Sequence, residues 1–165
     1  MHTVIRKATR ADLPQILAFI RALAAYEHLS DAVVLTEADL ERDGFGPRPF
    51  FECLIAEYDG RPAGYALYFF NYSTFLGKPG IYLEDLFVLP ELRGKGVGKA
   101  LLGRVAAEAV RNNCGRFEWS VLDWNQPAID FYRSQGGELM NEWRMVRVTG
   151  DALNRLAASA GDEAE

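Results

Sequence analysis

Residues 3–8 predict a strand at the start of the chain. The apolar residues that follow recur at helical spacing. Intervals of three and four residues connect Leu13, Ile16, Leu17, Ile20, Leu23 and Ala24. Pro14 falls near the first turn of this expected helix, where proline is tolerated. A second, short helix is expected at 36–40, and the polar linker between the two helices is a candidate substrate loop.

The middle of the chain predicts strands. Residues 51–58 and 62–72 are rich in aromatic and aliphatic side chains, and the Asp59-Gly60 pair between them is a strong hairpin signal. A third strand is expected at 81–89, after a turn that contains Gly77 and Gly80. Three strands in succession indicate an antiparallel meander.

Helices and strands alternate in the rest of the chain. We expect a helix at 97–110, a strand at 117–122, a helix from Asn125 to the Gly136-Gly137 pair, a strand at 138–148 and a short helix at 151–158. This order predicts an α/β (α+β) fold with a mixed central sheet and helices on both faces. We assign one domain to residues 1–150, and a short helix with an acidic, frayed tail to residues 151–165.

Composition and charge exclude several classes of protein. The chain has 165 residues, of which 49% are hydrophobic and 25% charged, as in a soluble globular domain. The net charge of −5 argues against nucleic-acid binding. Residues 1–92 are net acidic and residues 93–150 net basic, which suits two ligands of opposite sign, although ordinary scatter gives the same pattern.

Metal and disulfide chemistry have little support in the sequence. Cys53 and Cys114 are the only cysteines and His2 and His28 the only histidines, so a zinc site is hard to build and we expect no metal. The longest uncharged stretch is too short and polar to span a bilayer, and the start is mixed and charged. We expect a cytoplasmic protein with no membrane partner.

A basic, glycine-rich turn between a strand and a helix carries the clearest chemistry. Its sequence runs Arg93-Gly94-Lys95-Gly96-Val97-Gly98-Lys99. Glycines let backbone N–H groups converge beside a helix N-terminus, which makes an anion cradle. Lys99 rules out a dinucleotide fingerprint here, and Arg93 with Ala100 rules out a Walker loop. The alternative is a glycine-rich loop without a ligand.

This turn resembles the acetyl-CoA pyrophosphate site of the GNAT N-acetyltransferase superfamily. Further motifs, among them Tyr82-Leu83-Glu84-Asp85 and Trp124-Asn125-Gln126-Pro127, resemble the diamine (spermidine/spermine) acetyltransferase family up to about Val148. The resemblance implies acetyl-CoA as cosubstrate and a homodimer. It assigns acetyl-CoA binding to Phe87, Val88, Arg93, Gly94, Lys95, Gly96, Val97, Gly98, Lys99, Asn125, Tyr132 and Arg133.

The same resemblance assigns the catalytic roles. Glu84 is the expected base and Tyr132 the expected acid that protonates the leaving thiolate. Adjacent strand residues point to opposite faces, so Glu84 and Asp85 reach one ligand only through a bulge or a splayed strand, which the family is known to have here. Tyr132 as a packed aromatic and Asn125 as a helix cap are the structural alternatives.

The expected substrate is a primary amine on a small cationic metabolite, attacked directly in a ternary complex. Carboxylates and aromatic faces that suit such a cation are found at Glu27, Phe75, Glu84, Asp85 and Trp143. Core packing is the alternative for Phe75 and Trp143. The segment Tyr72-Ser73-Thr74-Phe75 departs from the polyamine enzymes and resembles the thialysine branch, which favours a lysine-like amino acid or a diamine. A protein lysine or N-terminal acetyltransferase and a non-catalytic acyl-CoA sensor remain alternatives.

Overall fold

The computed structural model describes residues 2–161, so part of the expected frayed tail lies outside the described residues. The chain divides into two compact units, residues 1–122 and 123–165. The first unit holds the sheet and the helices α1 to α3, and the second holds α4 and α5. The domain boundary that we placed at residue 150 stays a prediction.

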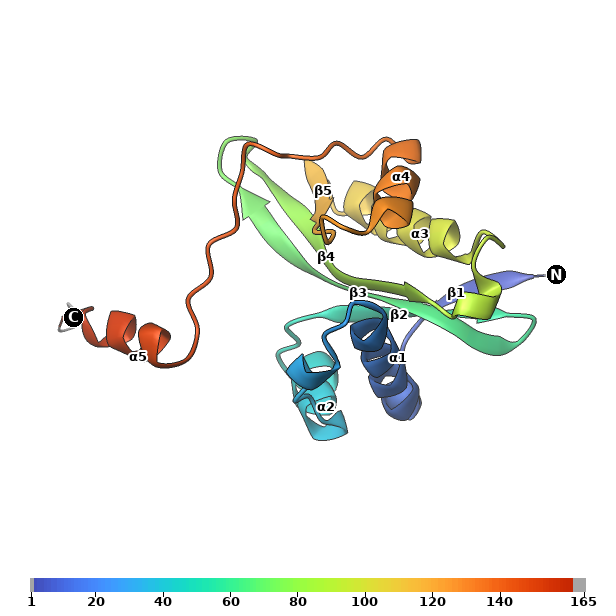
Figure 1. Cartoon of the computed structure of the whole chain (residues 1–165), viewed down its shortest axis with the longest axis horizontal. Helices are drawn as coiled ribbons and strands as arrows, with labels where there is room; N and C mark the ends of the chain where they lie inside the picture. The colour runs from blue at the N-terminus through green and yellow to red at the C-terminus, as the bar shows by residue number, and fades with distance from the viewer. Residues whose placement is uncertain (1, 162–165) are drawn as a thin grey trace. The chain divides into compact units, whose positions relative to one another are not determined.

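A five-stranded sheet in the order β1-β2-β3-β4-β5 forms the centre of the first unit (Figure 1). Neighbouring strands from β1 to β4 are antiparallel, and β5 is parallel to β4. The mixed sheet predicted from the sequence is therefore confirmed. Its strands are β1 (Thr3–Lys7), β2 (Glu52–Tyr58), β3 (Arg61–Ser73), β4 (Lys78–Val88) and β5 (Arg116–Trp119).

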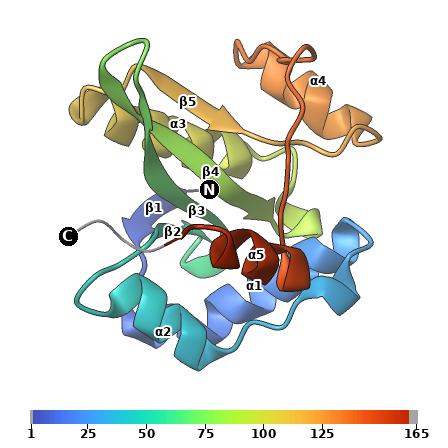
Figure 2. The same ribbon diagram turned by 90° about the vertical axis from the view of Figure 1, so that its left-hand side faces the viewer.

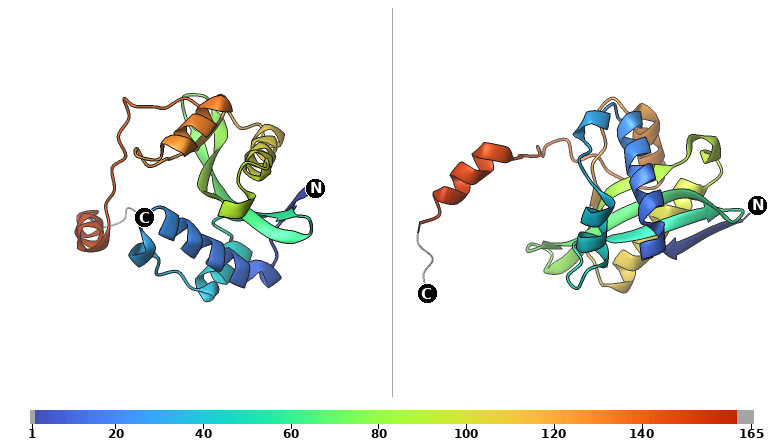
Figure 3. Two further views of the ribbon diagram at one scale, coloured as in Figure 1. Left: turned by 45° about the vertical axis from the view of Figure 1, so that its right-hand side comes forward. Right: turned by 90° about the horizontal axis from the view of Figure 1, so that it is seen from below.

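Helices cover both faces of this sheet, as expected. The helices α1 (Leu13–Tyr26) and α2 (Glu37–Phe45) lie side by side on one face (Figure 2), and α3 (Val97–Arg111) lies on the other (Figure 3). Thr36 caps α2 because its hydroxyl accepts a hydrogen bond from the Asp39 N–H at 3.2 Å. One-turn 3-10 helices cover Arg10–Asp12, Ser30–Ala32 and Pro90–Leu92.

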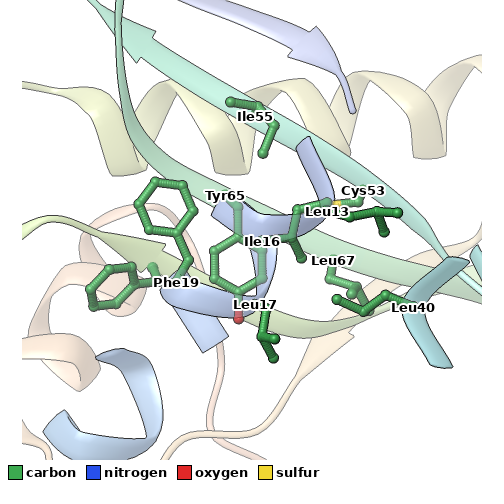
Figure 4. Close-up of a cluster of buried hydrophobic side chains, with 10 residues drawn as sticks. Leu13, Ile16, Leu17, Phe19, Leu40, Cys53, Ile55, Tyr65 and Leu67 are labelled. Atoms are coloured by element: carbon green, nitrogen blue, oxygen red, sulfur yellow. The ribbon is translucent and has the colours of Figure 1, made fainter. Parts of the chain in front are cut away.

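The core between α1 and the sheet is aliphatic and aromatic (Figure 4). The apolar stripe of α1 packs on alternate residues of β2 and β3, as a helix on a pleated sheet must. The side chains in this cluster are Leu13, Ile16, Leu17, Phe19, Leu40, Cys53, Ile55, Tyr65, Leu67 and Phe87.

The hairpin predicted at Asp59-Gly60 is present. Asp59 and Gly60 have φ angles of 49° and 79°, the positive values that a tight two-residue turn between twisted strands requires. The next hairpin joins β3 to β4 through a longer turn, at residues 74–77. In this hairpin β3 extends to Ser73, one residue beyond the predicted end.

The second unit contains α4 (Gln126–Ser134) and α5 (Gly150–Ala158), close to their predicted bounds. The strand expected at 138–148 is wrong, because this segment has no regular structure and does not belong to the sheet. The sequence predicted it, but a strand forms only where its backbone groups pair with a neighbour, which a local pattern does not specify. The strand expected at 117–122 also ends earlier, at Trp119.

Candidate functional site

The glycine turn joins β4 to α3 and has the geometry of an anion cradle. Gly94 and Gly96 have φ angles of 76° and 82°, and Gly96 is the N-cap residue of α3. A Cβ atom built on either glycine meets no other atom within 4 Å, so the backbone is open to a ligand. The first N–H groups of α3 have no partner within the helix and lie at its positive end. The turn therefore fits a phosphate-bearing ligand.

The basic side chains of the turn are held by aromatic rings. The Arg93 guanidinium carbon lies 4.6 Å from the centroid of the Tyr26 ring and 5.7 Å from that of Phe87. Arg93 Nε also donates a hydrogen bond to the Val88 carbonyl at 3.1 Å. Lys95 Nζ lies 5.4 Å from the Tyr58 ring centroid. These contacts limit the rotamers of both cations and leave their positive charge beside the turn.

A β-bulge lies in β4 at the position where the family resemblance implied a bulge or a splayed strand. Leu67 of β3 pairs with Asp85, and the next residue, Tyr68, pairs with Leu83. Glu84 is therefore the extra residue of the bulge. Because the bulge interrupts the alternation of side chains, Glu84 and Asp85 are no longer forced to opposite faces of the sheet.

Three carboxylates interact at this bulge. Glu84 is exposed, whereas Asp85 and Glu27, which lies at the end of α1, are half-buried. Burial, opposed by a hydrogen bond from Tyr65 and helped by the negative charges of Glu84 and Glu27, raises the pKa of Asp85 to about 6. Burial also raises the pKa of Glu27. The cluster is thus an anionic site in which one carboxylate titrates near neutral pH.

The strands β4 and β5 separate beside the bulge. Their parallel ladder covers Gly80 to Leu83 and stops there, whereas β4 continues to Val88. Gly64 of β3 pairs with Val88 at the end of β4. A Cβ atom built on Gly64 would clash with the Phe87 carbonyl oxygen, so the close approach of the two strands requires glycine there. Phe87 and Val88 therefore connect the carboxylate cluster to the glycine turn along one strand.

Phe75 is not part of this arrangement in the first unit. It lies in the turn between β3 and β4 with its side chain fully exposed, so the core-packing interpretation of Phe75 is wrong. The seven residues from Lys78 to Glu84 span about 20 Å of extended strand. The described unit brings Glu27, Glu84 and Asp85 together and leaves Phe75 at the far end of β4.

The remaining predicted residues belong to the second unit. Asn125 caps α4, where its Oδ1 accepts a hydrogen bond from the Ala128 N–H at 3.4 Å, so its structural role is confirmed. Tyr132 is half-buried on α4 with its ring 5.5 Å from that of Phe131. Arg133 and Trp143 are exposed. The N–H groups of the expected Gly136-Gly137 pair close the helix on the carbonyls of Arg133 and Tyr132, at 3.0 Å each.

Two residues near the site were missed in the sequence. Tyr65 donates a hydrogen bond from its hydroxyl to Asp85 Oδ2 at 2.8 Å. Gly64 permits the close approach of β3 to Phe87. A tyrosine in the apolar stretch from Ala63 to Leu67 was the available signal for the first, because a buried hydroxyl needs a partner. The partner itself depends on the bulge register, which no local pattern gives.

None of the helices within residues 2–161 is long and apolar enough to cross a membrane. Within that range, no three His, Cys, Asp or Glu side chains are grouped as metal ligands.

Known proteins resemble the chain in sequence. The model of the acetyltransferase (GNAT) family matches residues 15–136. The thialysine N-epsilon-acetyltransferase of Sus scrofa is 44% identical over 165 residues, which cover 93% of this chain and 96% of that protein. The L-ornithine N5-acetyltransferase of Arabidopsis thaliana is 34% identical over 201 residues, which cover 94% of this chain and 88% of that protein.

Solved structures also resemble it. An integron cassette protein from the mobile metagenome of V. cholerae has a TM-score of 0.79 and 29% identity, over 96% of this chain and 99% of that one. An aminoglycoside acetyltransferase from an uncultured soil sample has the same fold, with a TM-score of 0.71 and 19% identity over 90% and 95% of the two chains. On the family match and the two relatives, the chain belongs to the acetyltransferase (GNAT) family and is an N-acetyltransferase.

Proposed function

We propose that this N-acetyltransferase transfers an acetyl group from acetyl-CoA to the primary amine of a small cationic metabolite, a thialysine-like or lysine-like amino acid or a diamine. The observation that carries the proposal is the cluster of Glu27, Glu84 and Asp85 beside a basic anion cradle. Carboxylates attract an ammonium group, and the cradle suits the opposite charge of a phosphate. The relatives named for thialysine and L-ornithine support an amino acid with an amine in its side chain.

The residues around the glycine turn fit acetyl-CoA. Its phosphates would meet the N–H groups from Gly94 to Lys99 and the side chains of Arg93 and Lys95, while Phe87 and Val88 would line the thioester arm. Asn125, Tyr132 and Arg133 are proposed to bind acetyl-CoA on family resemblance. Acetyl-CoA supplies an acetyl group already activated as a thioester.

The chain must first remove a proton from the substrate. A lysine-like amine with a pKa of about 10.4 is neutral in roughly one molecule in 2,500 at pH 7, which costs about 4–5 kcal/mol. Glu84 is exposed at the bulge and is proposed to accept this proton through water. The amine then attacks the thioester directly, and Tyr132 protonates the departing sulfur.

No residue is proposed as a covalent acetyl carrier. Cys53 is buried in β2, and burial together with the charges of Asp12 and Asp85 raises its thiol pKa to about 12. A thiol of this kind is a poor nucleophile at neutral pH. Transfer in a ternary complex therefore suits the chain better than an acetyl-enzyme.

The cellular setting is also part of the proposal. Cys53 and Cys114 are free thiols, which suits a reducing compartment such as the cytoplasm. A homodimer is proposed from the resemblance to the diamine acetyltransferases, and the net charge of −5 supports a small-molecule partner over nucleic acid. Sedimentation equilibrium of the full chain tests the dimer directly.

A coupled assay for free CoA thiol tests the proposed reaction. The panel contains acetyl-CoA with thialysine, lysine, ornithine, putrescine, spermidine, spermine and a lysine peptide. Turnover of thialysine or the other short amines supports the proposal, and preference for spermidine would contradict the short-substrate assignment. Activity on the peptide alone would identify a protein acetyltransferase. Acetyl-CoA binding without any turnover would favour the sensor alternative.

A further inference from the structure

Tyr65 combines a fully buried ring with a hydroxyl that reaches the carboxylate cluster. The ring lies in the core of the first unit (Figure 4), stacked on Phe19 with centroids 5.7 Å apart and planes 3° apart. Its hydroxyl donates to Asp85 Oδ2 at 2.8 Å. Tight packing around the ring fixes the hydroxyl in one place, so it presents a rigid donor to the carboxylate.

Asp85 needs such a donor because its surroundings oppose its charge. Glu84 from β4 and Glu27 from the end of α1 face it with like charge, and burial removes it from water. Cys53 from β2 also faces it, but that thiol stays neutral, since its own pKa is raised. The Tyr65 hydroxyl from β3 is the group that acts in the other direction and lowers the pKa of Asp85. A hydroxyl donates more strongly to a carboxylate than to its protonated form.

We propose that Tyr65 is a positioning residue that keeps Asp85 charged and oriented as the anionic anchor for the substrate ammonium group. This inference rests on the proposed function and adds a residue to it. Tyr65 acts only through Asp85, because its ring is enclosed by the core and its hydroxyl is engaged by the carboxylate. Glu84, the proposed base, acts on the rate of transfer, whereas Asp85 and Tyr65 act on capture of the cation.

The test is the pH profile of Tyr65→Phe, which removes the hydroxyl and keeps the ring. Without the hydrogen bond the Asp85 pKa rises, so the acid limb of kcat/KM for the amine moves to higher pH. The expected shift is roughly one pH unit, which corresponds to about 1.4 kcal/mol. The change appears as a higher KM near pH 6, because a neutral Asp85 no longer attracts the ammonium group. At saturating amine, kcat stays within about twofold.

Tyr68→Phe is the matched control. Tyr68 is also a buried tyrosine of β3 whose hydroxyl donates to a carboxylate, Glu52 Oε2, at 2.8 Å. It lies an odd number of residues from Tyr65 and so serves the other face of the sheet. This variant should leave the acid limb unmoved. An unmoved limb in folded Tyr65→Phe, or an equal fall in kcat at every pH, overturns the proposal.

A direct titration separates this inference from the proposed function. The carboxyl carbon of Asp85 is followed by NMR against pH in the wild-type chain, Tyr65→Phe and Tyr68→Phe, without any substrate. An upward shift in Tyr65→Phe alone supports the link between the two residues even if none of the amines is acetylated. An identical titration in the three proteins overturns it even if acetylation is observed. Thermal unfolding shows whether each variant is folded.

Discussion

The Arg93 guanidinium lies over the Tyr26 ring, with its central carbon 4.6 Å from the ring centroid. This contact joins the basic turn after β4 to the last residue of α1, from elements that are distant in sequence. Glu27 follows Tyr26 directly and belongs to the carboxylate cluster. Arg93, the proposed partner of the phosphates, and Glu27, a proposed partner of the amine, are therefore held by adjacent parts of the first unit.

Arg93→Ala should weaken acetyl-CoA binding by about tenfold, since a charge-assisted phosphate contact is worth about 1.4 kcal/mol or more. Arg93→Lys should recover only part of this loss, because a lysine ammonium cannot both stack on Tyr26 and donate to the Val88 carbonyl as the guanidinium does. Isothermal titration calorimetry with acetyl-CoA measures both. Arg42→Ala on α2 is the control for loss of one positive charge, and an equal effect there would contradict a specific role for Arg93.

Gly98→Ala should separate stability from cosubstrate binding. Gly98 is in the first turn of α3, and a Cβ atom there would lie 3.6 Å from Val88 Cγ2, an ordinary contact. Alanine favours the helix, so we expect the free energy of unfolding to rise by about 0.5–1 kcal/mol. Acetyl-CoA affinity should fall because the new methyl group occupies the approach to the turn. Chemical denaturation and calorimetry report the two effects.

Gly96→Ala is the contrasting variant. Its φ of 82° disfavours any residue with a Cβ, although the space around it is open. The free energy of unfolding should therefore fall by about 1–2 kcal/mol. Equal stability of the two alanine variants would show that the turn conformation in solution differs from that described.

Much of the first unit could be predicted from the sequence because its signals are local. The Asp59-Gly60 turn, the stripe of α1 and the glycine turn each depend on a few neighbouring residues with a strong conformational preference. The presence of a bulge could be inferred from two adjacent acidic residues only with the family resemblance. The residues opposite the bulge, Leu67 and Tyr68, could not be predicted, since the register depends on pairing across strands.

The segment 138–148 shows the opposite case. Its local sequence predicts a strand that the structure does not have, since a strand requires a neighbouring backbone. The link from Tyr65 to Asp85 was also beyond the sequence, because it joins residues on different strands through a side chain. Local patterns therefore located the glycine turn better than the environment that tunes the carboxylates.

Glu84→Gln should lower kcat at pH 7 by about 100-fold if Glu84 is the base, with activity recovering as pH rises towards the pKa of the amine. Loss of its charge also lowers the Asp85 pKa, so the Asp85 carboxyl carbon should titrate at lower pH, opposite to the effect of Tyr65→Phe. Steady-state kinetics from pH 5 to 10 measure the first change, and NMR titration measures the second. Glu91→Gln, an exposed residue before the turn, is the control. An unchanged kcat profile in Glu84→Gln would remove Glu84 as the base.

Tyr132→Phe should lower kcat by about 10- to 100-fold and leave acetyl-CoA affinity unchanged, because only the donor to the departing thiolate is lost. Rapid-quench turnover and calorimetry separate the two quantities. Tyr72→Phe, which removes an exposed hydroxyl on β3, is the control. Parallel losses of turnover and affinity would assign Tyr132 a packing role on α4 instead.

Asp85→Asn and Asp12→Asn should change stability in opposite directions at pH 8. The folded-state pKa of Asp85 is raised to about 6, so above that pH its charge destabilises the fold, by up to about 3 kcal/mol, and Asp85→Asn should raise the free energy of unfolding. The hydrogen bonds from Arg6 lower the pKa of Asp12 to about 2, so its charge stabilises the fold above pH 4 and Asp12→Asn should cost about 2 kcal/mol. Urea denaturation at pH 8 and pH 4 measures both variants. The gain in unfolding free energy of Asp85→Asn should disappear at pH 4, where the wild-type carboxyl is protonated in the folded state. A loss of stability of Asp85→Asn at pH 8 would show that the charged form of Asp85 does not destabilise the fold.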